Sequence, residues 1–179
     1  NGAERVESDL VAQVKRDTAA FAGNGDPETG LNILANHIEK LGTDADVGVF
    51  LNVDHVPADD DAFIEACVSS GVPSSLMVDA SHDPFEENVS RTSEVVDMVR
   101  RRGEDMLVEA ELGMIKGLES GVETTEAYYT DPEQAVEFVD RTGVDLLAIS
   151  IGTEHGVSKG RDLELRPDIA REVGQALQD

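Results

Sequence analysis

The chain has 179 residues, a length that suits a single domain with one hydrophobic core. Its formal net charge of -24 at pH 7 excludes a basic nucleic-acid-binding surface and disfavours an anionic membrane as a partner. Aromatic residues make up only 4% of the sequence, too few for a surface on which bases could stack.

The carboxylates are spread along the whole chain, and only four of the 14 basic residues are lysines. Such a surface suits a cytoplasm with a high salt concentration, because dense ions screen the repulsion between like charges. We therefore expect a halophilic, cytoplasmic protein; the alternatives are an acidic protein in ordinary salt or a charged interaction tail. A lone cysteine, Cys67, excludes an intrachain disulfide, and no apolar run approaches the ~20 residues of a membrane span.

Residues 1–46 are expected to be a mainly helical lead-in. Apolar residues recur at helical spacing from Val6 to about Phe21, and a run rich in glycine and asparagine then ends the pattern. A second helix is predicted from Pro27 to Leu41, because Asp26 can cap it and proline suits the first turn.

From residue 47 onward, short apolar runs that predict strands alternate with segments that predict helices. Strands are expected at 47–53, 74–80, 106–112 and 144–152. Helices are expected at Asp61–Ser70, Pro84–Arg102, Pro132–Arg141 and Pro167–Leu177. This alternation favours parallel βαβ units, and titratable residues follow each strand, as in a (β/α)8 TIM barrel. A doubly wound open sheet is the competing fold, but no glycine-rich phosphate motif follows the first strand.

A closed barrel needs eight strands and about 250 residues, so four strands predict only an incomplete portion, about strands 3 to 6. We expect residues 1–179 to form one partial barrel domain, with the βα units in residues 47–179. The given chain is expected to be a fragment of a longer protein, and its first residue, Asn1, agrees with that expectation. The alternative is that strands are hidden in the helical-looking first segment.

Glu109 and Glu111 stand at alternate positions of an apolar segment that breaks into glycines at Gly113 and Gly117. Residues two apart on a strand point to the same side, so the two carboxylates would face one region and repel each other. A bound cation would relieve the repulsion. The alternative is an amphipathic surface strand with solvated glutamates.

Four segments, taken in order, resemble the class II, metal-dependent fructose-1,6-bisphosphate aldolases and their tagatose-bisphosphate relatives. Asn-Val-Asp-His at 52–55 resembles the HxDH motif of the family, and residues 109–117 carry its ExELG motif with a following glycine. Residues 79–88 and 129–156 resemble its fourth-strand segment and the approach to its sixth strand. The likeness runs from about Val47 to Ala176.

The resemblance implies that His55 and His155 bind the catalytic Zn2+ or another divalent metal. Asp79 and Glu111 match positions that bind a second, deeper metal in part of the family. The resemblance also implies a monovalent cation in some members. It further implies a homodimer or homotetramer that acts on a small sugar bisphosphate.

The resemblance assigns two proton-transfer residues and two substrate-binding residues. Asp54 would exchange a proton with the C4 hydroxyl of the ketose, and Glu119, expected in a loop, would act at the dihydroxyacetone phosphate carbon. Gly156 and Lys159 match the loop that meets a substrate phosphate. We therefore expect cleavage of fructose 1,6-bisphosphate to dihydroxyacetone phosphate and glyceraldehyde 3-phosphate. A tagatose-bisphosphate or other ketose-phosphate aldolase and a non-catalytic partial-barrel subunit are the alternatives.

The sequence departs from the family pattern in three places. Asn52 replaces the first histidine of HxDH, and Lys116 stands where the family often has glycine. The third metal histidine and the phosphate loops of strands seven and eight are expected beyond Asp179. A Schiff-base mechanism would need a lysine at a strand end. Neither Lys116, expected in a loop, nor Lys159 suits that role.

Overall fold

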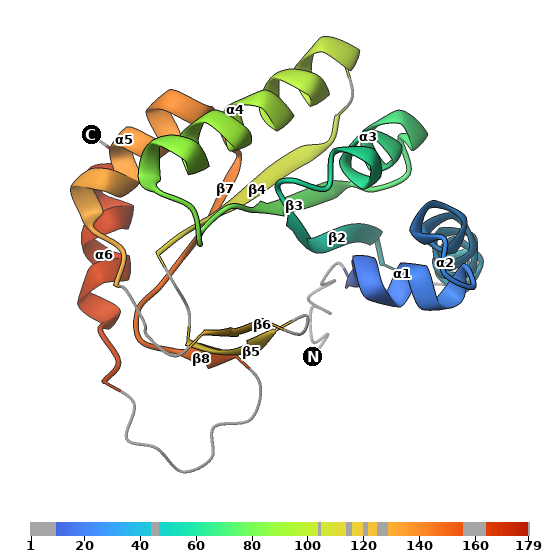
Figure 1. The fold of residues 1–179 in the computed structure, drawn as a ribbon, viewed down its shortest axis with the longest axis horizontal. Coiled ribbons are helices and arrows are strands. Elements are labelled where there is room, and N and C mark those ends of the chain that lie inside the picture. Colours follow the sequence, from blue (N-terminus) through green and yellow to red (C-terminus); the bar gives the residue numbers. More distant parts are fainter. Residues whose placement is uncertain are drawn as a thin grey trace, which may run out of the picture. The chain divides into compact units, whose positions relative to one another are not determined.

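The structure is a computed structural model that describes residues 10–43, 47–103, 105–113, 116–119, 122–124, 129–155 and 164–178. For 116–119, 122–124 and 154–155 it describes the backbone alone. Helices and strands alternate along most of the described chain, as Figure 1 shows. In the part of the chain described, no helix has the length and apolarity needed to cross a membrane.

The residues form two compact units. The first unit comprises residues 1–77 and 98–107, and the second comprises residues 78–97 and 108–179. Two strands, β3 (Ser75–Asp79) and β4 (Leu107–Leu112), and helix α4 (Phe85–Arg102) contribute residues to both units. The main sheet has five strands in the order β1-β2-β3-β4-β7.

The first unit begins with a strand, β1 (Leu10–Lys15), where the sequence pattern predicted helix. It pairs in parallel with β2 (Val49–Pro57), from Leu10 opposite Val49 to Lys15 opposite Asp54. The predicted helix from Val6 to Phe21 is therefore wrong for residues 10–15, and helix α1 covers only Arg16–Ala22. Leu10 and Val14 are four residues apart, a spacing that puts them on one face in a strand as well as in a helix.

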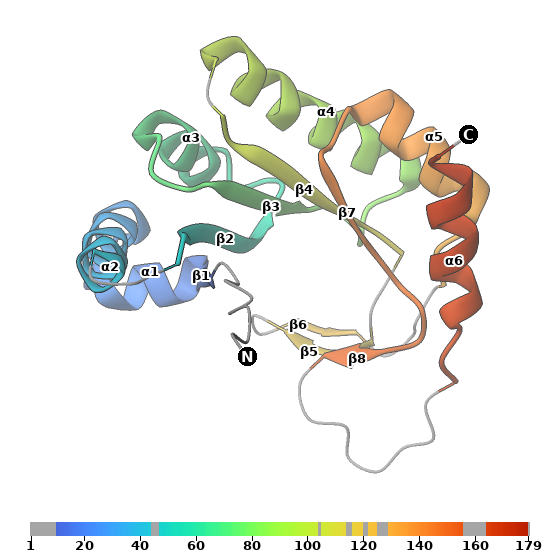
Figure 2. The same cartoon turned by 180° about the vertical axis from the view of Figure 1, so that it is seen from behind.

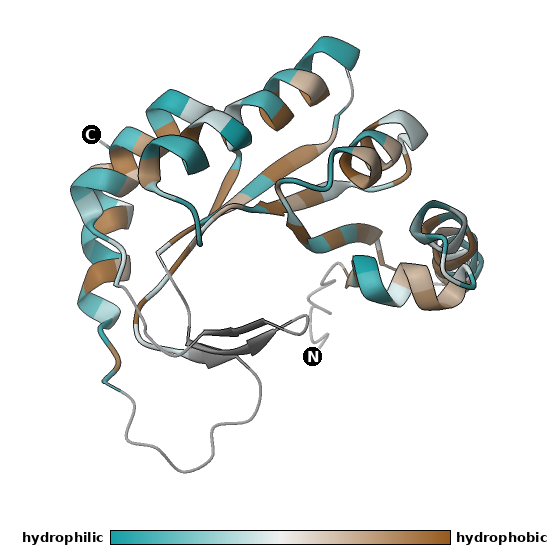
Figure 3. Cartoon of the chain, in the orientation of Figure 1, coloured by the Kyte–Doolittle hydropathy of each residue, from teal (hydrophilic) through white to brown (hydrophobic). Residues whose placement is uncertain are grey.

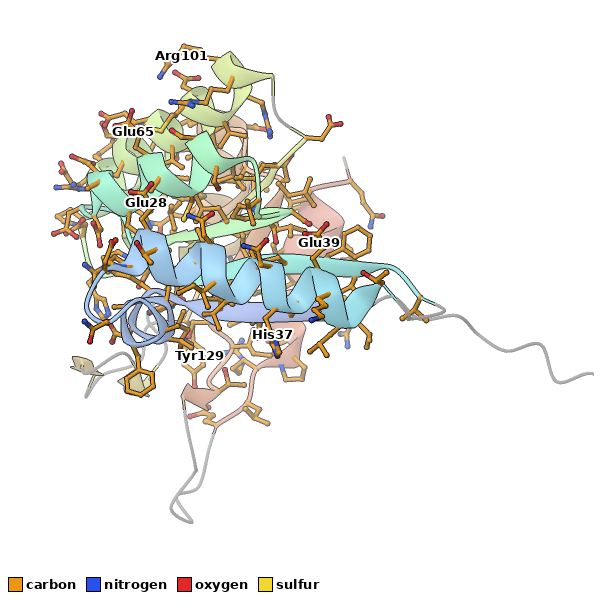
Figure 4. All side chains as sticks on the ribbon, turned by 90° about the vertical axis from the view of Figure 1, so that its right-hand side faces the viewer. Glu28, His37, Glu39, Glu65, Arg101 and Tyr129 are labelled. Carbon is orange, nitrogen blue, oxygen red and sulfur yellow. The ribbon has the colours of Figure 1, made fainter. Side chains whose placement is uncertain are left out.

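The predicted second helix is confirmed as α2 (Pro27–Gly42), with Asp26 accepting a hydrogen bond from the Glu28 N–H at 3.2 Å. Gly30 lets α1 and α2 approach closely, because a Cβ atom at this position would lie 1.6 Å from the Ala19 carbonyl oxygen. Figure 4 looks onto α2 and shows Glu28, His37 and Glu39 along it; all three are exposed. Helix α3 (Asp61–Ser70) has the predicted bounds and ends at Gly71, which has a φ of 60°.

The second unit contains helices α5 (Pro132–Thr142) and α6 (Pro167–Ala176), which pack against each other in Figure 2. Asp131 caps α5 as predicted, accepting hydrogen bonds from the N–H groups of Glu133 and Gln134. Strand β7 (Leu146–Ile149) pairs in parallel with β4, with Glu111 opposite Ala148.

A second, small sheet in this unit was not predicted. It consists of β5 (Lys116–Glu119), β6 (Val122–Thr124) and β8 (Glu154–His155), in the order β6-β5-β8. The backbone of Lys116 and Glu119 therefore lies in a strand, and the predicted loop at these positions is wrong. Strand β5 is antiparallel to β6, which follows it closely in the sequence, and parallel to β8, which is nearly 40 residues away.

The core consists of buried apolar residues of the strands and helices. Figure 3 colours the hydrophobic residues of these elements brown. On the strands, alternate residues are fully buried, including Leu76 and Val78 on β3 and Val108 and Ala110 on β4. Asp79 and Glu111 each follow one of these buried residues directly, so their side chains point to the opposite face of the strand. This alternation brings the polar residues of neighbouring strands to the other face of the sheet.

Candidate functional site

Glu111, near the end of β4, is a carboxylate that is only 3% exposed, while Glu109 is half-buried. The alternative of a solvated surface strand is therefore wrong for Glu111. Helix α4 fixes this part of the strand: the side-chain amide of Asn88 donates to the Glu111 carbonyl oxygen at 3.0 Å. Thr92, one turn further along α4, donates to the other end of the same amide at 3.1 Å.

The hydroxyl group of Thr130 links the end of β4 to the end of β7. Its Oγ1 donates to the Leu112 carbonyl oxygen at 2.5 Å and accepts from the Ser150 N–H at 2.8 Å. Thr130 is 3% exposed and Ser150 is fully buried, so no water competes for these bonds. The sequence indicated neither Asn88 nor Thr130, because their partners are backbone groups on distant strands.

Asp79 is the last residue of β3 and is half-buried. One carboxylate oxygen, Oδ1, accepts a hydrogen bond from the Ser81 N–H at 2.8 Å. This bond closes a short turn and holds the carboxylate at the end of the strand.

His55, towards the end of β2, has a φ of 57°. A residue with a Cβ atom rarely adopts this left-handed conformation, which costs of the order of 1 kcal/mol or more and occurs preferentially at functional sites. Local backbone geometry, rather than strand alternation alone, therefore sets where the imidazole lies.

The structure brings together three of the four residues predicted to bind metal. One ligand atom from each of His55, Asp79 and Glu111 lies within 4.8 Å of the other two. One imidazole nitrogen and two carboxylate oxygens are a donor set that suits zinc and other divalent metals. Glu111 is nearly completely buried, so its charge interacts strongly with the groups around it.

The fourth predicted ligand, His155, has its backbone in β8, paired with Gly117, but its side chain is outside the described residues. The side chain of Glu119 is also outside them, as are Gly156 and Lys159 entirely. The roles predicted for these four residues remain predictions.

Asp54, the predicted proton-transfer residue, forms an ion pair with Lys15 of β1. The Lys15 Nζ atom lies 3.2 Å from Asp54 Oδ2, and the two side chains are 35% and 17% exposed. Sequence reasoning missed Lys15 because residues 10–15 were assigned to a helix. The available signal was the apolar side chains at alternate positions before this lysine, Leu10, Ala12 and Val14.

Asn52 and Cys67 are two further polar residues of the first unit. Asn52 is 3% exposed and its amide donates to Ser75 Oγ at 2.7 Å, while its Oδ1 is buried without a partner among the described residues.

Burial raises the pKa of the Cys67 thiol to about 12, and the negative charge of Asp60 adds to the effect. Cys67 therefore stays protonated at neutral pH and is a core residue, not a nucleophile or a metal ligand.

A family model described as fructose-bisphosphate aldolase class-II matches residues 1–178. The chain belongs to this family of class II aldolases. It is 40% identical over 157 residues to the D-tagatose-1,6-bisphosphate aldolase subunit GatY of Klebsiella oxytoca. That alignment covers 87% of this chain and 51% of the relative, so the chain spans about half the length of the curated relative it matches.

Two solved structures are similar over almost the whole chain. The YdjI aldolase from Escherichia coli K12 matches 96% of this chain and 55% of its own, with a TM-score of 0.72 and 33% identity. The fructose-bisphosphate aldolase (Fba) from Campylobacter jejuni matches 96% of this chain and 53% of its own, with a TM-score of 0.75 and 25% identity. The predicted fold class, an incomplete portion of a TIM barrel, is confirmed, with five strands in the main sheet where four were predicted.

Proposed function

We propose that this chain is part of an aldolase that reversibly cleaves fructose 1,6-bisphosphate to dihydroxyacetone phosphate and glyceraldehyde 3-phosphate, with Zn2+ as the metal. The observation that carries the proposal is the group formed by His55, Asp79 and Glu111, which lies on the strands that bear the family motifs. We infer that His55 binds the catalytic metal together with His155. Asp79 and Glu111 are proposed to hold a second ion.

When bound, a divalent cation supplies a Lewis acid that polarises the C2 carbonyl of the ketose. The residues of the chain position the substrate and move its protons. Asp54 takes the proton of the C4 hydroxyl as the bond between C3 and C4 breaks, and C4 becomes the aldehyde carbon. Glu119 is proposed to exchange a proton at the dihydroxyacetone phosphate carbon, and Gly156 and Lys159 to bind a phosphate group.

A specific observation favours a second candidate substrate, tagatose 1,6-bisphosphate. The relative that is 40% identical over 157 residues is named as a subunit of a D-tagatose-1,6-bisphosphate aldolase. The two sugars differ only in stereochemistry at C4, where the proposed role of Asp54 lies. Either sugar is therefore compatible with the proposed arrangement, and their relative kcat/KM values decide the specificity.

The test is an assay of the purified full-length protein with both ketose bisphosphates, with and without a chelator. We expect cleavage that a chelator abolishes and that added Zn2+ restores. We also expect no inactivation by borohydride in the presence of substrate, because no lysine forms a Schiff base. That expectation extends to Lys15, which ends a strand but whose ammonium group is paired with Asp54.

Two results would contradict the proposal. Borohydride inactivation together with resistance to chelators would indicate a Schiff-base aldolase. If the zinc-loaded protein cleaved neither sugar and a His155→Ala variant bound zinc as well as the wild type, a non-catalytic subunit would be the better description.

A further inference from the structure

The parallel pairing of β1 with β2 puts Lys15 directly opposite Asp54, at the end of β1. Their charged atoms are 3.2 Å apart, and neither side chain is more than about a third exposed. A partly buried pair of this kind is screened less by salt than a pair on the open surface. The lysine is therefore well placed to hold the carboxylate in one orientation.

The neighbouring cation, Arg16, has a different partner. Its guanidinium pairs with Asp60, which caps α3 by accepting a hydrogen bond from the Phe63 N–H. The side chains of Arg16 and Asp60 are 38% and 21% exposed, close to the values for Lys15 and Asp54. The two ion pairs are alike in setting, but only the pair with Lys15 involves a residue predicted to take part in the reaction.

From this contrast we propose that Lys15 is a positioning residue, which holds the Asp54 carboxylate for proton exchange with the substrate. This inference rests on the proposed function. The ammonium group binds Oδ2, and Oδ1 is the oxygen that we assign to the C4 hydroxyl. As the bond between C3 and C4 breaks, its electrons go to the ketone fragment and the hydroxyl proton goes to Oδ1. Lys15 keeps its own protons throughout.

Proton transfer requires the two heavy atoms to lie within hydrogen-bonding distance and in the right orientation. An aspartate side chain without a fixed partner populates several rotamers, and most of them would point Oδ1 away from the substrate. Lys15 restricts that freedom from the neighbouring strand. Asn52, two residues before Asp54, is itself fixed by its hydrogen bond to Ser75, so β2 is held on its other side as well.

The test compares Lys15→Met, which removes the charge and keeps the length, with Lys15→Arg, which restores a cation. Arg16→Met is the matched control, since it removes an adjacent ion pair of similar exposure. We expect Lys15→Met to lower kcat about 10- to 100-fold with little change in KM, as for a misplaced catalytic group. Lys15→Arg should recover most of the loss, and Arg16→Met should leave kcat and KM within about 2-fold of the wild type.

A double-mutant cycle with Asp54→Asn tests whether Lys15 acts through Asp54. Adding Lys15→Met to Asp54→Asn should slow the enzyme no further, because the group that Lys15 positions is already lost. An equal slowing in both backgrounds would overturn the proposal. So would a rise in KM at unchanged kcat, which would make Lys15 a substrate-binding residue instead.

Crystal structures of the wild type and Lys15→Met supply a measurement that does not depend on turnover. We expect Asp54 to adopt a different side-chain rotamer in the variant, or several. An unchanged rotamer would overturn the positioning role even in an active enzyme. If the wild type cleaves neither sugar while the rotamer changes, the proposed function fails and the positioning of Asp54 by Lys15 still stands.

Discussion

At the scale of single residues, Glu111 differs from the other carboxylates of this acidic chain by its burial. A carboxylate that is 3% exposed is costly unless a cation or hydrogen-bond donors compensate it, and His55 and Asp79 each bring a ligand atom within 4.8 Å. Asp79 alone would add repulsion. A divalent ion makes the arrangement of two carboxylates and one imidazole favourable.

We therefore predict that Glu111→Gln lowers the affinity for Zn2+ by at least about 10- to 100-fold, the effect usual for groups that support a metal site. The amide keeps the size of the side chain and loses its charge. Isothermal titration calorimetry measures the change, and Glu94→Gln, on the exposed side of α4, is the control. Equal affinity and stoichiometry in Glu111→Gln and the wild type would show that Glu111 does not bind the ion.

At the scale of elements, the strand ends depend on side chains from the helices and loops that follow them. Asn88 of α4 holds the carbonyl group of Glu111, and Thr130, just before α5, links Leu112 to Ser150. These bonds are buried, so removing one side chain leaves backbone groups without partners. The position of Glu111 therefore depends on residues that have no proposed role in metal binding or catalysis.

Replacing Thr130 by valine keeps the shape and removes the hydroxyl group. The Leu112 carbonyl and the Ser150 N–H would each lose a buried partner, so we expect a loss of about 1–3 kcal/mol in the free energy of unfolding. Urea denaturation measures it. Thr43→Val, where the hydroxyl is exposed and bonds to Glu39 within the same helix end, should change stability by less than about 0.5 kcal/mol. A Thr130→Val protein as stable as this control would contradict the account.

At the scale of the whole molecule, the dominant property is the net charge of -24. Several acidic side chains form ion pairs with arginines, such as those of Glu86 and Glu137 with Arg141. However, the 38 acidic residues of the chain greatly outnumber its 14 basic residues. The remaining repulsion acts over about 10 Å at 0.1 M salt and only about 3 Å at 1 M salt. Salt should therefore stabilise the folded chain.

We predict that raising KCl from about 0.1 M to 2 M raises the thermal midpoint by roughly 4–8 °C, which corresponds to a gain of about 2 kcal/mol. Circular dichroism during heating measures the midpoint. At pH 5, nearer the sequence pI of about 4.2, the net charge is smaller and the same salt should have less effect. A midpoint that does not respond to KCl would argue against adaptation to high salt.

Features that depend on neighbours along the chain could be predicted from the amino-acid sequence alone. The bounds of α3, the caps at Asp26 and Asp131 and the strands β2, β3, β4 and β7 followed from apolar periodicity and local capping chemistry. The family motifs also lie within single segments, so the amino-acid sequence was enough to propose His55, Asp79 and Glu111 as metal ligands before their proximity was known.

Features that depend on partners far away in the sequence became visible only in the folded protein. Residues 10–15 fit a helix or a strand equally well, and only pairing with β2, about 40 residues later, makes them a strand. This strand pairing places Lys15 beside Asp54. The left-handed backbone of His55 and the burial of Glu111 likewise exist only in the folded chain. Local periodicity specifies which face a residue occupies, whereas hydrogen-bond partners and burial come from the packing of distant strands.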